Sequence, residues 1–403
     1  MTTAPPASAG REGPADPVAA ATHRDPYPYY AELAARRPIY RDDGLGLWVA
    51  ASATSVTAVL TSDRCLVRPA DEPVPSALVG SPAGAIFGQL VRMSDGGRHA
   101  VMKPAVSEAT ATLEAQVGES ARRWAEHLAA ELRPATDAGG LGDFAFQLPV
   151  YALASLLGVP AERLAETAAQ VSALVRGIAP GATPEQQARG SVAAQDLIET
   201  FRERLAARST ATGESPLGRL VQAMARSGHD DPNAVAANGI GFLSQAYDAT
   251  AGLIGNTLVA LGRHANVSAA RAPDRRYLNG VVREVVRHDP PVQNTRRFLA
   301  ADGVVGGQSM HADDAVLVLL AAANRDPAAN PQPALFDPHR PARRAFTFGV
   351  GPHACPGEAI ATTIAEAGVA QLLACGVEPA RLVETVTYRP SANTRVPLFA
   401  PDG

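Results

Sequence analysis

Residues 348–359 read FGVGPHACPGEA, and they are the most informative part of the chain. Gly349 and Gly351 permit an unusual turn, and Pro356-Gly357 is typical of a helix start. Cys355 therefore lies where backbone N–H groups converge and where the positive end of a helix dipole lowers the pKa of a thiol. A thiolate held in this way suits a soft or redox-active metal. The simpler alternative is a buried free cysteine in a tight turn.

This segment resembles the haem-binding loop of the cytochrome P450 family, whose pattern is Phe-Gly-x-Gly-x-His-x-Cys-x-Gly. The resemblance implies a haem b iron with the Cys355 thiolate as axial ligand, which favours O–O cleavage on the opposite face. The same resemblance places the other matching residues around the haem. The chain matches the pattern at Phe348, Gly349, Gly351, His353, Cys355 and Gly357.

A second motif, Arg-Glu-Val-Val-Arg, occupies residues 283–287. Glu284 and Arg287 are three residues apart and share one face of a predicted helix, where they would ordinarily form a solvated ion pair. They resemble the Glu-x-x-Arg pair of the family, which locks with an arginine from the irregular stretch before the cysteine. Arg340 is the best match for that arginine, and the resemblance gives the trio a structural role.

Haem carries two propionate groups, so its pocket needs cationic or N–H donors. By resemblance, these donors are Arg297, His99 and Lys103. Two departures from the family appear here. Lys103 stands where an arginine is common, and Ala345 stands where a histidine often precedes the cysteine loop. The nearby Arg344 or Arg296 could compensate.

The similarity runs from about Pro26 to the C-terminus and implies a mostly α fold with a minor β part, in which a long central helix crosses the haem. We expect residues 1–20 to form a disordered tail and residues 21–403 to form a single haem domain. Apolar periodicity and turn residues predict the individual elements. Predicted helices include residues 26–36, 121–132, 148–157, 161–175, 184–207, 217–225, 233–264, 275–288 and 356–374; predicted strands are residues 295–299, 303–307 and 315–320.

The longest predicted helix, residues 233–264, follows an Asp-Pro pair that is typical of a helix start. At 1.5 Å per residue it spans roughly 50 Å, enough to cross the molecule. Its residues are mostly apolar, so most of its faces should be buried. Gln245, Tyr247, Asp248 and Thr250 are exceptions at its centre. Buried polar groups need partners or a cavity, and a cavity here would accept a ligand.

Most P450 proteins carry an acid followed by a threonine at this place, and the pair relays protons to iron-bound oxygen. Here Asp248 aligns with the acid and Ala249 with the threonine, so the hydroxyl is missing. Thr250 lies one residue further, about 100° around the helix, and cannot simply replace it. Gln245 precedes Ala249 by one turn and should face the haem.

Three interpretations of this departure remain open. Gln245, or a polar group of the substrate, holds the water that Ala249 cannot hold. Alternatively, the reaction is a ring closure, a coupling or another radical step that needs no relay. The plainest interpretation is an ordinary hydroxylase in which Ala249 weakens the coupling of electron flow to product.

Composition excludes several classes of protein. The 403 residues include 36 basic and 40 acidic side chains, a net charge of -4, which argues against nucleic-acid or anionic-membrane binding. Three scattered cysteines argue against a disulfide scaffold. No apolar run is long enough for a membrane span, and no secretory signal is present. These features predict a cytoplasmic protein that binds no membrane and is a monomer.

The family resemblance also implies partners and a substrate site. Electrons would come from a ferredoxin or flavodoxin with its reductase, docking near Cys355 at Arg343, Arg344 and Lys103. The leading function is monooxygenation of a medium-sized natural-product intermediate, with oxidative cyclisation or coupling next. A non-catalytic recruitment or gas-sensing module is an alternative from another class. The predicted substrate contacts are Phe87, Leu90, Leu174, Gln245, Val292, Gln293 and Asn294.

Overall fold

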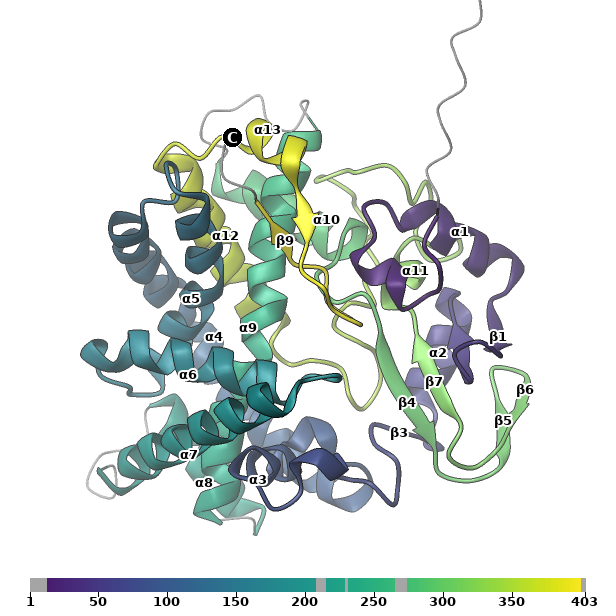
Figure 1. Ribbon diagram of the computed structural model, residues 1–403, viewed down its shortest axis with the longest axis horizontal. Coiled ribbons are helices and arrows are strands. Elements are labelled where there is room, and N and C mark those ends of the chain that lie inside the picture. Colours follow the sequence, from purple (N-terminus) through teal and green to yellow (C-terminus); the bar gives the residue numbers. More distant parts are fainter. Residues whose placement is uncertain (1–12, 208–214, 229–230, 265–273, 400–403) are drawn as a thin grey trace, which may run out of the picture.

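The structure is a computed structural model that describes residues 13–207, 215–228, 231–264 and 274–399. It is mostly helical with a minor β part, as expected (Figure 1). The helices are α1 Tyr27–Arg36, α2 Ala53–Thr61, α3 Pro82–Gln89, α4 Gly96–Leu132, α5 Ala138–Leu156, α6 Leu164–Gly177, α7 Pro184–Ala207, α8 Pro216–Arg226, α9 Pro232–Arg263, α10 Arg275–His288, α11 Leu320–Asn324, α12 Glu358–Ala374 and α13 Pro379–Thr385. The strands are β1 Ile39–Asp42, β2 Leu47–Ala50, β3 Cys65–Leu66, β4 Thr295–Leu299, β5 Gly303–Val305, β6 Gln308–Met310, β7 Ala315–Val318, β8 Thr387–Tyr388 and β9 Pro397–Leu398.

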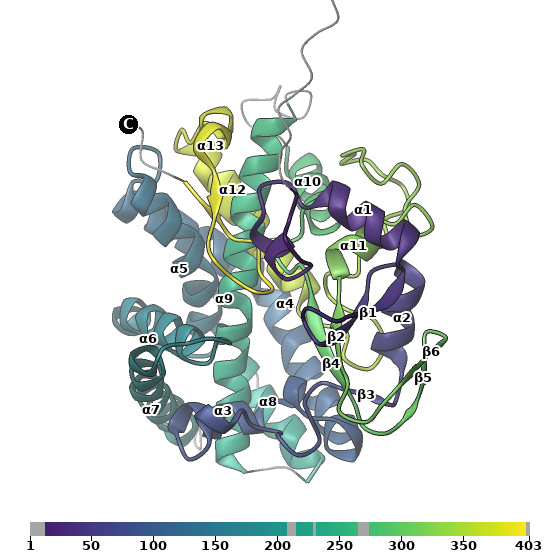
Figure 2. The same ribbon diagram turned by 45° about the vertical axis from the view of Figure 1, so that its right-hand side comes forward.

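Helix α9 runs through the middle of the molecule, between the helix-rich part and the sheet (Figures 1 and 2). The Asp231 side chain accepts a hydrogen bond from the Asn233 N–H at 2.9 Å, and Pro232 occupies the first turn, so the predicted start is confirmed. The helix packs against α5, α6, α7 and α12. Every residue from Thr250 to Leu261 is buried, which accounts for the apolar character of the sequence there.

The five-stranded sheet has the order β1-β2-β7-β4-β3. Strands β2 and β7 are parallel, and the other neighbours are antiparallel. Because side chains alternate along a strand, the two arginines of β4 take opposite sides. Arg297 is buried and Arg296 is exposed. Of these two arginines, only Arg297 is therefore directed toward the interior of the protein.

The structure differs from the predictions mainly in the N-terminal half. Helix α4 begins at Gly96 rather than near residue 121 and continues through Pro104; α5 likewise begins ten residues early and contains Pro149. Glycine and proline lower helix propensity, but tertiary packing overrides them here. Helices α4, α5 and α12 pack against one another. The buried positions at the start of α4 recur at helical spacing: Met102, Ala105, Ala109, Leu113 and Val117.

A fully buried arginine joins the beginning and the end of the described chain. Arg395 pairs with Asp289 at 2.8 Å and donates to the backbone oxygens of His23 at 2.5 Å and Arg24 at 3.1 Å. The Tyr27 hydroxyl donates to the same carboxylate. These contacts hold α1 and the end of α10 against the C-terminal strands.

The N-terminal boundary lies earlier than the sequence suggested. A 3-10 helix covers Ala19–Thr22, and Ala20 in it is fully buried. The predicted tail reached residue 20, and its first part, residues 1–12, lies outside the described residues.

Within the described ranges, no single helix combines the length and the apolar composition of a membrane span. Only α12 and α13 reach both together, and they are bent by 103° at their junction.

Candidate active site

The cysteine loop is built from two left-handed glycines. Gly349 and Gly351 have φ values of 71° and 76°, a conformation that other residues rarely adopt. A Cβ on Gly351 would also lie 3.1 Å from the Leu60 carbonyl oxygen. The turn lets the Cys355 N–H donate to the Phe348 carbonyl at 2.7 Å. Immediately afterwards, α12 begins at Glu358.

Cys355 itself lies at this helix start with an accessible side chain. The Gly357 N–H donates to its sulfur at 3.3 Å, as the sequence predicted. Burial nevertheless raises the pKa of the Cys355 thiol, and the Gly357 N–H, Lys103 and Arg92 offset that rise only in part. The expected net lowering of the pKa is therefore wrong for the protein alone. A bound cation would be needed to deprotonate the thiol fully.

His99 and Arg297 come from α4 and β4 and fit the predicted role in binding carboxylates. Both side chains are buried, and both have a nitrogen without a hydrogen-bond partner in the described chain, Nε2 of His99 and Nε of Arg297. Burial, followed by the neighbouring His353 and Lys103, lowers the pKa of His99 to about 4. Buried donors are normally satisfied, so these two atoms are suited to the propionates of a haem.

His353 and Lys103 hold the loop itself. The His353 ring lies 4.0 Å from the His99 ring, and its Nε2 is 3.0 Å from Asp95 Oδ1. Lys103 Nζ donates to the Ala354 carbonyl at 2.7 Å, one residue before the cysteine. Lys103 therefore ties α4 to the cysteine loop. The two proposed substitutes for it point elsewhere, since Arg296 is exposed and Arg344 lies over the Phe346 ring at 4.9 Å.

The predicted Glu284 cluster forms and contains an additional arginine. The carboxylate of Glu284, fully buried, lies 2.6 Å from Arg287, 3.3 Å from Arg340 and 2.8 Å from Arg343. Burial alone would raise the pKa of Glu284, but hydrogen bonds and charge from Arg287 and Arg343 outweigh it and lower the pKa. Arg287 also donates to the Pro333 and Leu335 carbonyls, so the cluster holds the irregular stretch before the cysteine.

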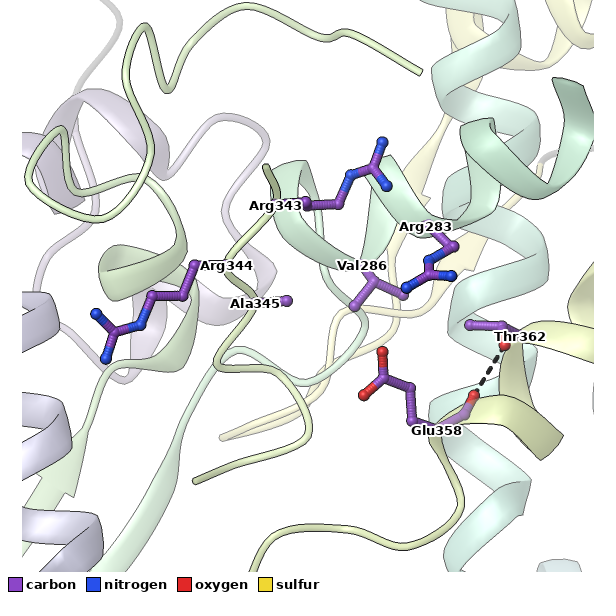
Figure 3. A pocket seen from close by; sticks show the side chains of 7 residues that line it. All are labelled: Arg283, Val286, Arg343, Arg344, Ala345, Glu358 and Thr362. Atoms are coloured by element: carbon purple, nitrogen blue, oxygen red, sulfur yellow. Dashed lines mark hydrogen bonds between the residues drawn. The ribbon is translucent and has the colours of Figure 1, made fainter. Parts of the chain in front are cut away.

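A cavity of about 270 Å³ lies beside the cysteine loop, between α10, α12 and residues 343–345. Figure 3 shows Arg283 and the Glu358 carboxylate projecting into it, while Arg344 points away on the far side of Ala345. Arg283, Arg344 and Glu358 are exposed. Arg343, which was predicted to contact the electron donor, is paired with the buried Glu284 at 2.8 Å.

On the other side of the loop, the centre of α9 carries the predicted polar residues. Gln245 is exposed, and its Nε2 donates to the Gly241 carbonyl at 2.9 Å. Ala249 is partly exposed one turn later. Thr250 is fully buried, and its hydroxyl has no partner among the described residues. It therefore does not share a face with Ala249, as the helical geometry predicted.

Most of the predicted substrate contacts are buried in the structure, and their role in binding a substrate stays a prediction. Gln293 is fully buried and donates to the Pro290 carbonyl, and the Asn294 amide donates to the Ala392 carbonyl. Leu90 packs against Gly241, where a Cβ would lie 2.8 Å from Leu90 Cδ2. Of the predicted set, Gln245 is exposed and Val292 is partly exposed. The buried members are Phe87, Leu90, Leu174, Gln293 and Asn294.

Two groups near the site were not predicted. Arg389, next to β8, pairs with Asp248 of α9 at 2.5 Å. Residues 391–394 form the tip of the hairpin between β8 and β9, and the Asn393 carbonyl accepts from the Gln293 N–H at 2.8 Å. No local sequence signal marks either one, because each is defined by a contact with a distant part of the chain.

The comparisons with known proteins agree with this arrangement. The family model for cytochrome P450 matches residues 222–379. The chain is 28% identical to the 20-oxo-5-O-mycaminosyltylactone 23-monooxygenase of Streptomyces fradiae, over 91% of this chain and 86% of that protein. It is also 28% identical to the cytochrome P450 monooxygenase PikC of Streptomyces venezuelae, over 89% and 87%. The crystal structure of CalO2 superposes with a TM-score of 0.78 at 27% identity, over 94% of this chain and 97% of that one.

The chain thus combines the long helix α9, the glycine turn around Cys355 and the Glu284 cluster. The two relatives that it matches over most of their length are named as monooxygenases. The chain belongs to the cytochrome P450 family and is an oxidoreductase of the monooxygenase type.

Proposed function

We propose that the protein holds haem b with the Cys355 thiolate as axial ligand and hydroxylates a specialised-metabolite intermediate. The observation that carries the proposal is the cysteine loop, where the Gly357 N–H meets the Cys355 sulfur at 3.3 Å. When bound, a thiolate-ligated haem supplies activation of O₂. In the overall reaction, R–H, O₂, two electrons and two protons give R–OH and H₂O.

The chain's own residues bind and orient in this scheme. His99 and Arg297 bind the two propionates through their unpartnered nitrogens. Gln245 is fixed by the bond from its Nε2 to Gly241, which leaves its Oε1 as an acceptor for a water or for a donor group of the substrate. Asp248 and Gln245 are then the polar groups one residue and one turn before Ala249, where the threonine hydroxyl is missing.

A medium-sized substrate with hydrogen-bonding groups suits this site. Gln245 supplies an accessible amide and Val292 an apolar contact. The relative from Streptomyces fradiae is named as a monooxygenase of 20-oxo-5-O-mycaminosyltylactone. We therefore propose a natural-product intermediate rather than a plain fatty acid.

A second candidate function is oxidative cyclisation or coupling, which inserts no oxygen atom. It is favoured by Ala249, and by the burial of Thr250 away from it, because the usual hydroxyl is absent from this face of α9. Turnover under isotopically labelled O₂ distinguishes the two candidates. Hydroxylation places the label in the product, whereas cyclisation or coupling places it only in water.

The direct test of haem–thiolate ligation is the difference spectrum of the reduced protein with carbon monoxide. We expect the long-wavelength Soret band for which the family is named. A protein that binds no haem, or that shows only the short-wavelength band after gentle preparation, would contradict the proposal.

The proposed electron donor is an acidic ferredoxin or flavodoxin that docks beside the cysteine loop, near the residues drawn in Figure 3. Arg283 and Arg344 are exposed there, and neither has an ion pair among the described residues. Lys103 donates to the Ala354 carbonyl and Arg343 is paired with Glu284, whereas the charges of the exposed Arg283 and Arg344 are not paired with an acid among the described residues. We therefore propose Arg283 and Arg344 as the main contacts. Attraction between opposite charges raises association rates and is screened by salt.

Replacing Arg283 and Arg344 by alanine together should slow reduction by such a donor at low ionic strength by roughly 10-fold, within the range of electrostatic steering. The rate of the wild type should fall with added salt, and that of the variant should change little. Arg36→Ala, an exposed arginine on α1, serves as control. Equal salt dependence in the wild type and the double variant would rule out this docking face.

A further inference from the structure

The C-terminal hairpin lies directly along α9 (Figure 1). Two glycines of α9 allow the close approach. A Cβ on Gly252 would lie 2.8 Å from Pro291 Cβ and 3.1 Å from the Arg395 carbonyl oxygen. A Cβ on Gly255 would lie 3.0 Å from the Pro397 ring. The spacing between hairpin and helix is therefore fixed by backbone contact on this face of α9.

Asp248 is one turn before Gly252 on the same face, and the hairpin brings Arg389 to it. The two side chains form an ion pair at 2.5 Å between Nη2 and Oδ2, and each is about one-fifth exposed. The Arg389 N–H donates to the Val396 carbonyl at 3.0 Å. Its guanidinium lies 5.1 Å from the Phe146 ring. Arg389 is thus held by the opposite strand and by α5.

The Asp248 carboxylate is bound on one side only. Oδ2 has the charge of Arg389, whereas Oδ1 is buried and has no hydrogen-bond partner in the part of the chain that the structure describes. A buried acceptor without a donor is costly. The same atom is well suited to take up a proton and give it away, because no other bond must break.

We propose that Arg389 is a positioning residue for proton delivery by Asp248. The inference rests on the proposed function above. By holding Oδ2, Arg389 keeps the carboxylate in one orientation and leaves Oδ1 as the atom that exchanges protons. Because Ala249 supplies no hydroxyl, the orientation of Asp248 matters more in this chain than it would beside a threonine. The hairpin thereby contributes to the chemistry without touching the cysteine loop.

The test uses the haem-loaded protein, a ferredoxin with its reductase, a nicotinamide reductant and O₂, without added metabolite. Under these conditions O₂, two electrons and two protons give H₂O₂. The rate of O₂ consumption is measured in H₂O and in D₂O for the wild type and four variants. These are Arg389→Gln, Arg389→Lys, Asp248→Asn and the double variant that combines Asp248→Asn with Arg389→Gln. The matched control is Arg41→Gln, which breaks the ion pair between Arg41 of β1 and Asp314.

We expect Arg389→Gln to lower the rate about 10-fold and to enlarge the solvent isotope effect, since positioned proton transfer contributes at least this much. Arg389→Lys should recover part of the loss. In the Asp248→Asn background, Arg389→Gln should have no further effect, because Arg389 acts through Asp248. The control should match the wild type.

Additive losses in the double variant, or an unchanged isotope effect in Arg389→Gln, would overturn the inference. If Arg389→Gln does not retain haem, Arg389→Lys takes its place in the comparison; an intermediate rate and isotope effect would support the inference, and values equal to those of the wild type would contradict the expected partial loss. Failure of the proposed function is recognised separately, because the wild type itself would then lack the long-wavelength carbon monoxide band.

Discussion

Replacing Cys355 by serine should abolish the long-wavelength carbon monoxide band and lower product formation by more than about 100-fold. Loss of a residue that only supports a metal ligand already costs up to about 100-fold, and Cys355 is proposed as the ligand itself. The reason is chemical rather than steric, because serine fits the loop as well as cysteine. Its hydroxyl cannot supply the electron density that a thiolate gives to the iron. Difference spectroscopy and product analysis at equal haem content measure the two effects.

Cys375→Ser is the matched control for this variant. Cys375 lies just beyond α12 and donates only to the Leu372 carbonyl. Its replacement should leave both the band and turnover as in the wild type. If Cys355→Ser kept the long-wavelength band, Cys355 could not be the axial ligand.

Replacing Glu284 by glutamine should lower the free energy of unfolding by about 3–5 kcal/mol, the usual cost of removing one partner from a buried ion pair. Glu284 and Arg287 are fully buried, and Arg340 and Arg343 are at most 15% exposed, so three guanidinium groups would lose their carboxylate together. Urea unfolding at constant slope measures the change. Glu185→Gln, whose pair with Arg189 is exposed, should cost about 0.5 kcal/mol or less.

The same cluster predicts a pH dependence. The pKa of Glu284 is lowered in the folded protein, so its contribution to stability is complete above the ordinary pKa of about 4.3 and is lost as the pH falls toward the lowered value. The difference in stability between the wild type and Glu284→Gln should therefore shrink as the pH falls below about 4.3. A difference that stays constant down to acid denaturation would contradict the ionised state assigned to Glu284.

The elements predicted best from the sequence are those with strong local signals. Helix α9 has a capping aspartate, a first-turn proline and a long apolar run, and its bounds were predicted to within one residue at each end. Helix α4 was predicted only in part, because Pro104 interrupts the local pattern while packing against α5 and α12 sustains the helix. The two-residue strands β8 and β9 have too little sequence to give a periodic signal.

The same distinction applies to the site. Cys355 and the pair of Glu284 and Arg287 belong to short motifs, so their resemblance to the motifs of the family indicated them. Gln293 and Asn294 were assigned to the substrate because the resemblance to the family places the strand after Pro291 at the substrate site. The side-chain contacts of these residues, bonds from both amides to backbone carbonyls, had no signal in the sequence. Arg389 could not be found by such reasoning, since its partner lies in a different helix far along the chain.

The contacts of Arg395 set a limit on the order of folding during synthesis. Its guanidinium donates to the carbonyl of Ala21, 374 residues earlier in the chain. At about 5–20 residues per second, roughly 20–75 s pass between translation of these two positions. Throughout that time the carbonyl oxygens of Ala21, His23 and Arg24 lack this donor. The segment before α1 can therefore make its contacts with Arg395 only after residue 395 has been translated, when the central helices have already had time to assemble.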